Sequence, residues 1–118
     1  MHRLSVRNKT SISSEILPGT LEMLILKTLT RGPAHGYGIA RHLEQMSSDV
    51  LQVGESSLYP ALQRLLVNEW VTAEWGETDT GRRARFYRIT PSGRKRMAAE
   101  AAGFGRVVDA ITAIMQAS

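Results

Sequence analysis

The segment that decides the fold spans residues 56–67 and reads Ser-Ser-Leu-Tyr-Pro-Ala-Leu-Gln-Arg-Leu-Leu-Val. A proline is tolerated in a helix only near its first turn, so Pro60 prevents this helix from starting much before Ser56. Ser56 or Ser57 is expected to be the N-cap. The side chains at inward helical spacing are Leu58, Leu62, Leu65 and Leu66. The outward face would carry Tyr59, Gln63, Arg64 and Val67.

Two further helices are predicted before this segment. The first spans residues 18–30, starts at Pro18 and stops at the Arg31-Gly32-Pro33 sequence. It is so apolar that other elements should nearly surround it. The second runs from Gly36 to about Ser48. A short β-branched stretch, residues 50–53, predicts a brief strand between the second and third helices.

A hairpin and a long helix are predicted after this segment. Residues 71–75 and 85–89 alternate apolar with polar side chains, which indicates two strands joined by a long, basic tip. The last helix should begin with Thr90 as cap and Pro91 at its first position, and should run towards Met115.

The last helix carries an apolar stripe of a/d heptad type. Its members are Met97, Ala101, Phe104, Val108, Ile111 and Met115. Gly103 and Gly105 each weaken the helix by about 1 kcal/mol, so it needs a surface to pack on. The stripe predicts a homodimer interface. The alternatives are that it packs on the domain's own first helix, or that separate faces of the helix do both.

This order of elements predicts a mostly α member of the α+β class: a winged helix-turn-helix with a long C-terminal dimerisation helix. The 118 residues suit a single domain. We expect a flexible basic arm over residues 1–16, a winged-helix domain over 17–90 and the dimerisation helix over 91–118.

The charge distribution favours binding to double-stranded DNA. The net charge is +4, and residues 82–96 hold seven basic and no acidic side chains. Small polar groups at the start of the third helix can meet phosphates and base edges. The residues expected at the DNA are Ser56, Ser57, Tyr59, Gln63, Arg64, Arg82, Arg83 and Arg85. Alternatively, the serines are only caps, Tyr59 packs on the domain, and the arginines are merely solvated.

Other classes of protein find less support in the sequence. There is no cysteine, signal peptide or membrane-spanning run, which indicates a cytoplasmic protein. No nucleophile elbow, phosphate loop or metal-ligand pair is present, so we expect no enzyme, no metal and no cofactor. The rival hypothesis is a winged helix that contacts another protein, which should show an apolar patch in place of the cationic wing tip.

Four motifs in order resemble the PadR family of regulators. Residues 17–26 resemble its opening helix and residues 35–39 its second-helix entry. Residues 57–65 resemble its recognition helix, and residues 81–93 resemble its wing and the start of its last helix. The resemblance covers about residues 16 to 115, and its single helix after the wing is similar to the short subfamily.

This resemblance implies a cytoplasmic bacterial repressor that binds an inverted repeat and is released by a small molecule or a physiological signal. It adds Tyr37 to the DNA-facing residues. Some members of the short subfamily hold flat aromatic molecules at the dimer centre against an aromatic residue of the last helix, and Phe104 falls at that position. Phe104 is smaller than the expected tryptophan and is flanked by glycines, so plain dimer packing is the alternative role.

Overall fold

Helix α2 (Pro18–Leu29) lies at the centre of a computed structural model that describes residues 18–118. The side chains of Ile25, Leu26 and Leu29 are almost fully buried, as expected for a helix that is apolar on most faces. The elements that follow are β1 (Ala34–His35), α3 (Gly36–Met46), α4 (Glu55–Val67), β2 (Val71–Glu77), β3 (Arg83–Ile89) and α5 (Pro91–Gln116). The expected N-terminal arm lies outside the described residues.

The predicted strand over residues 50–53 is wrong, because the segment forms an irregular connection. After α3 the chain turns through two residues with positive φ. The N–H of Leu51 then donates to Ser47 Oγ at 3.0 Å, and the N–H of Val53 donates to Glu44 Oε2 at 3.2 Å. Side chains at the end of α3 therefore satisfy these donors, and no neighbouring strand is required.

Helix α4 begins at Glu55, two or three residues earlier than a serine N-cap would place it, and neither serine caps it. Its N-cap is Gly54, which provides no side-chain hydrogen bond. Ser56 and Ser57 lie inside the first turn, and Pro60 follows in the second. The leucines of this helix face the core as predicted, with Leu58, Leu62 and Leu65 fully buried and Leu66 partly buried.

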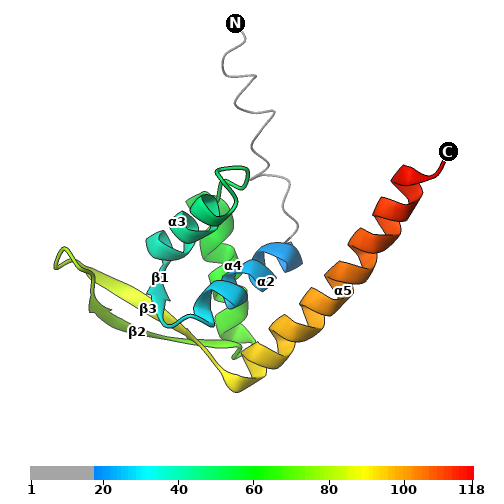
Figure 1. Ribbon diagram of the computed structural model, residues 1–118. Helices are drawn as coiled ribbons and strands as arrows, with labels where there is room; N and C mark the ends of the chain where they lie inside the picture. Colours follow the sequence, from blue (N-terminus) through cyan, green and yellow to red (C-terminus); the bar gives the residue numbers. More distant parts are fainter. Residues whose placement is uncertain (1–17) are drawn as a thin grey trace, which may run out of the picture.

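The sheet has three strands in the order β1-β3-β2, all antiparallel. The β2–β3 hairpin, here called the wing, pairs Val71 with Ile89 at its base and Glu77 with Arg83 near its tip. Strand β1, which the sequence did not predict, pairs Ala34 with Tyr87. The wing projects from the helices on the side opposite to the free end of α5 (Figure 1).

Helix α5 is anchored to the domain at its first turn. Thr90 is the N-cap and Pro91 opens the helix, as predicted. The Thr90 hydroxyl accepts the N–H of Gly93 at 2.9 Å and donates to the Glu69 carbonyl at 2.9 Å. Met97 packs against the core, whereas the second half of the helix extends away from the domain (Figure 1).

Candidate nucleic-acid interface

A groove of about 480 Å³ lies between the start of α3, the outer face of α4 and the wing. We call it the interface groove. Its lining residues are His35, Gly36, Tyr37, Tyr59, Gln63, Trp75, Arg83, Ala84, Arg85 and Tyr87. Three elements that are distant in sequence thus place aromatic, amide and guanidinium groups on one concave surface.

Helix α4 supplies Tyr59 and Gln63, which lie one helical turn apart on its exposed face. The Tyr59 ring lies against Gly36, the first residue of α3. A Cβ at Gly36 would lie 3.0 Å from the Tyr59 hydroxyl oxygen, so a larger residue would push the ring outward by a few tenths of an ångström. Packing against α3 therefore fixes one edge of the Tyr59 ring while the other remains exposed.

The first turn of α3 supplies Tyr37, whose side chain is 69% exposed. His35 is the N-cap of this helix, and its Nδ1 accepts the N–H of Gly38 at 3.1 Å. The imidazole also meets Phe86 of β3 edge-to-face, with ring centroids 5.3 Å apart. His35 therefore joins the start of α3 to the wing and holds Tyr37 at the rim of the groove.

The wing supplies the cationic wall of the groove. The Arg83 guanidinium lies over the Trp75 ring at 5.0 Å, and that of Arg85 lies over the Tyr87 ring at 5.9 Å. Arg82 lines an adjoining hollow at the wing tip, which Tyr37 also lines. Within residues 18–118, none of these three arginines forms an ion pair, so their charges are available to a polyanion.

Tyr87 lies at the buried inner end of the groove. Burial raises the pKa of its hydroxyl group, and the neighbouring Arg85 partly opposes that increase. Tyr87 therefore remains neutral at physiological pH and supports the arginine without adding negative charge to the groove.

The other predicted DNA contacts lie outside the groove. Ser56 is exposed and Ser57 half-buried at the start of α4. Arg64 donates a hydrogen bond from Nε to the carboxylate of Glu22 on α2, so its charge is partly neutralised. Conversely, His35 and Trp75 line the groove but were not predicted. The position of a tryptophan close to the basic tip in the sequence was the signal for Trp75, whereas the capping role of His35 required the structure.

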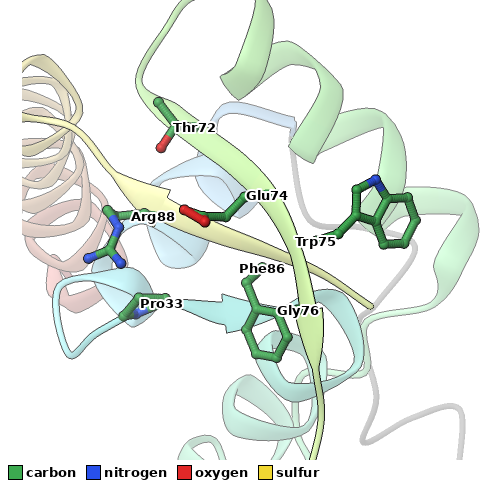
Figure 2. Close-up of a pocket in the computed structure, with 7 residues that line it drawn as sticks. All are labelled: Pro33, Thr72, Glu74, Trp75, Gly76, Phe86 and Arg88. Carbon is green, nitrogen blue, oxygen red and sulfur yellow. The ribbon is translucent and has the colours of Figure 1, made fainter. Parts of the chain in front are cut away.

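The seven basic residues between Arg82 and Arg96 do not form one patch. Arg88 lines a smaller hollow of about 210 Å³ on the face of the wing that looks away from the helices, where Figure 2 shows it with Glu74 and Phe86. Arg96 pairs with Glu100 at 2.8 Å and stacks on Trp70. The basic run is thus divided between the groove, the outer face of the wing and α5.

The predicted dimer stripe lies on the exposed part of α5. Phe104, Val108 and Ile111 are 46%, 40% and 53% exposed, and Met115 is exposed as well. An adjoining hollow of about 740 Å³ separates α2 from α5 and is lined by Met23, Phe104 and Ile111 among others. Of the stripe residues only Met97 packs against the protomer core, so most of this apolar surface has no partner within the protomer.

The molecule resembles known proteins in both sequence and fold. The family model described as the transcriptional regulator PadR-like family matches residues 25–99. The chain belongs to this family. PadR-like proteins are transcriptional regulators rather than enzymes, and the winged helix-turn-helix predicted from the sequence is confirmed.

Three relatives illustrate the extent of this PadR-like similarity. An uncharacterised protein of Lysinibacillus sphaericus is 30% identical over 83 residues, which are 70% of this chain and 76% of the relative. A transcriptional regulator from Clostridium thermocellum superposes with a TM-score of 0.73 at 28% identity, over 80% of this chain and 91% of that chain. A PadR-like regulator from Bacillus cereus shares the fold, with a TM-score of 0.74 at 23% identity, over 88% and 99% of the two chains.

Two further properties bear on this PadR-like chain. In the part of the chain that the structure describes, no helix combines the length and the apolar character needed to cross a bilayer. Among the same residues, 18–118, no cluster of three or more His, Asp or Glu side chains is arranged to hold a metal ion.

Proposed function

We propose that this PadR-like regulator is a homodimeric repressor that binds an inverted-repeat operator in double-stranded DNA. The observation that carries the proposal is the convergence of Tyr37, Tyr59, Gln63, Arg83 and Arg85 on one groove. A dimer bound at a promoter would occlude the polymerase over about two turns of duplex.

In this proposal α4 enters the major groove. Gln63 has the amide geometry for bidentate hydrogen bonds to an adenine edge, and Tyr59 lies one turn closer to the helix start. Ser56 and Ser57, at the positive end of the helix, would contact the phosphates that border the major groove of the DNA. Arg64 would contribute less than predicted, because Glu22 already binds its guanidinium.

The wing arginines would neutralise phosphates beside the major groove. Arg82, Arg83 and Arg85 are exposed and form no ion pair within residues 18–118. Each phosphate contact releases a counterion, so the contribution of these arginines to DNA affinity should decrease steeply as the salt concentration rises.

The proposed dimer forms through the exposed stripe of α5. A stripe of this kind is covered when two helices pack side by side. Pairing through α5 would also place two α4 helices on the same side of a duplex, as an inverted repeat requires.

Release by a small molecule would act at the hollow between α2 and α5. Phe104 and Met23 give this hollow an aromatic and an aliphatic wall, suited to a flat apolar molecule. Binding of a flat aromatic dye by the wild type but not by Phe104→Ala, measured by the fluorescence anisotropy of the dye, would support this role. Equal dimer stability in the wild type and in Phe104→Ala would exclude a purely structural role for Phe104.

The alternative function, contact with another protein, finds less support in the groove. Its lining alternates aromatic rings with arginines and an amide, and Val67 is an isolated exposed aliphatic side chain on α4. A protein-docking module would present a continuous apolar patch instead.

The test removes charge from the wing tip. The double variant Arg82→Ala, Arg83→Ala should bind all duplexes more weakly and lower the slope of log affinity against log salt by about one per lost phosphate contact. Fluorescence anisotropy with a labelled duplex at several salt concentrations measures both. The matched control is Arg94→Ala with Lys95→Ala, an equal charge loss at exposed positions outside the groove. An unchanged slope in the wing variant would exclude the wing from DNA binding.

A further inference from the structure

Trp75 presents a large apolar ring to solvent on the groove side of the wing. Its side chain is 60% exposed although it lies in the middle of a regular strand. Figure 2 shows the indole on the opposite side of β2 from Glu74, although Trp75 also borders the smaller hollow on the outer face of the wing. Trp75 lines the interface groove as well, beside Arg83 and Arg85.

The register of the hairpin brings Trp75 and Arg83 together. Trp75 lies opposite Arg85, and Glu77 lies opposite Arg83, on one face of the wing. Glu77 is an available ionic partner, yet Arg83 stacks on the indole at 5.0 Å and forms no ion pair within the described residues. Stacking engages the flat face of a guanidinium and leaves its N–H groups free at the edge.

We propose that Trp75 is a positioning residue that holds the Arg83 guanidinium over the groove, ready to bind a DNA phosphate. This inference rests on the proposed function and assigns a role to a residue that does not itself carry charge. It also accounts for the exposed indole, because the ring serves as the platform on which the cation is ordered before DNA arrives.

The second tryptophan of the chain shows what a purely structural stack looks like. Arg96 lies over the Trp70 ring at 4.7 Å, in an arrangement similar to that of Arg83 and Trp75. However, Trp70 packs against the core, and Arg96 is already paired with Glu100. The two stacks differ in whether the guanidinium remains available, and only the one on the wing faces the groove.

A double-mutant cycle tests the role of Trp75. The variants Trp75→Ala, Arg83→Ala and the combination are titrated against a labelled 30-base-pair duplex of mixed sequence at several salt concentrations. Trp75→Ala should weaken binding about two- to fivefold and lower the salt slope, although it removes no charge. The combined variant should bind no more weakly than Arg83→Ala, because the ring acts through the arginine. Trp75→Phe should recover most of the affinity.

Fluorescence provides a second readout. In Trp70→Phe the only tryptophan is Trp75, and its emission should change when the duplex is added. In Trp75→Phe the remaining Trp70 emission should not change. Urea unfolding of Trp75→Ala should match the wild type, since the exposed ring buries little surface.

Several outcomes would overturn the role of Trp75. One is that Trp75→Ala keeps the wild-type affinity and salt slope. Another is that the losses of binding free energy in Trp75→Ala and Arg83→Ala add up in the combined variant. Loss of binding together with loss of folding in Trp75→Ala, without recovery in Trp75→Phe, would make the role structural. If the wild type itself ignored the duplex at low salt, the proposed function would fail as well. If the wild type binds the duplex and Trp75→Ala binds it with the same affinity and salt slope, only the inference about Trp75 is rejected.

Discussion

At the scale of single residues, Gly93 is the position at which the attachment of α5 depends most on the absence of a side chain. A Cβ there would lie 2.1 Å from the carbonyl oxygen of Trp70 and 2.9 Å from Ile89 Cγ1. The carbonyl belongs to the backbone and cannot rotate aside, so the start of α5 would have to move.

The variant Gly93→Ala should therefore lower the free energy of unfolding by about 2–4 kcal/mol, measured by urea denaturation. Gly19→Ala is the matched control, because a Cβ at that exposed helical glycine meets nothing within 4 Å. Its stability should be unchanged or higher by less than about 1 kcal/mol. Equal effects at the two glycines would contradict the close packing of α5 on Trp70.

Tyr87 gives the protein a pH dependence at alkaline pH. Burial raises the pKa of its hydroxyl group in the folded state above the ordinary value of about 10 in the unfolded chain. The unfolded chain therefore loses this proton first. The stabilising contribution is complete below about pH 10 and is lost as the pH rises from there through the folded-state pKa.

Tyr87→Phe should reduce this alkaline loss of stability. The measurement is urea unfolding at about pH 8 and about pH 11, compared between variant and wild type. Tyr37→Phe changes an exposed tyrosine and should retain the wild-type difference between the two pH values. An identical alkaline loss in Tyr87→Phe would show that another group causes it.

At the scale of elements, the cap of α3 connects stability to the interface. His35 accepts the N–H of Gly38, and Tyr37 lies in the same first turn. Removing the cap with His35→Ala should lower the free energy of unfolding by about 1 kcal/mol and weaken duplex binding as Tyr37 loses its fixed position.

The variant His35→Asn supplies a different side-chain acceptor at the same N-cap position and should recover most of the stability. Thermal denaturation and anisotropy titration measure the two effects. Recovery of stability without recovery of binding would mean that the edge-to-face contact with Phe86, which asparagine lacks, is what orders the groove.

The elements that the sequence predicted correctly are those with a strong periodic signal. The leucines of α4, the apolar α2 and the Thr90–Pro91 start of α5 all follow from local patterns that tertiary contacts reinforce. The predicted strand over residues 50–53 failed because Glu44 and Ser47 satisfy its donors. Strand β1 was not predicted because its two residues are too few to show an alternating pattern of apolar and polar side chains. The strand forms because it pairs with β3.

The candidate site was predictable in composition but not in arrangement. The basic tip indicated Arg82, Arg83 and Arg85, and the outward face of α4 indicated Tyr59 and Gln63. The sequence could not show that Glu22, 42 positions earlier than Arg64, binds that arginine. Such a contact joins distant segments, and no local pattern reports it.

At the scale of the whole molecule, the exposed stripe of α5 should determine the oligomeric state. Val108→Glu with Ile111→Glu places two carboxylates on the stripe and should give monomers that no longer bind an operator tightly. Sedimentation velocity measures the mass, and anisotropy measures the binding.

The matched control for the stripe is Ala98→Glu with Ala102→Glu, which adds the same charge on exposed positions of α5 outside the stripe. This variant should retain the wild-type mass. If the stripe variant remains dimeric, the dimer interface lies elsewhere on the protein and α5 does not form it.

The length of α5 has a mechanical consequence for such a dimer. Its 26 residues form one uninterrupted rod of about 39 Å, which Thr90 and Gly93 clamp to the base of the domain. A tilt of about 5° where two rods cross would swing each domain by about 3 Å at the far end, a displacement set by the rod length. Small adjustments at the crossing point would thus be geometrically amplified into a change in the separation of the two α4 helices.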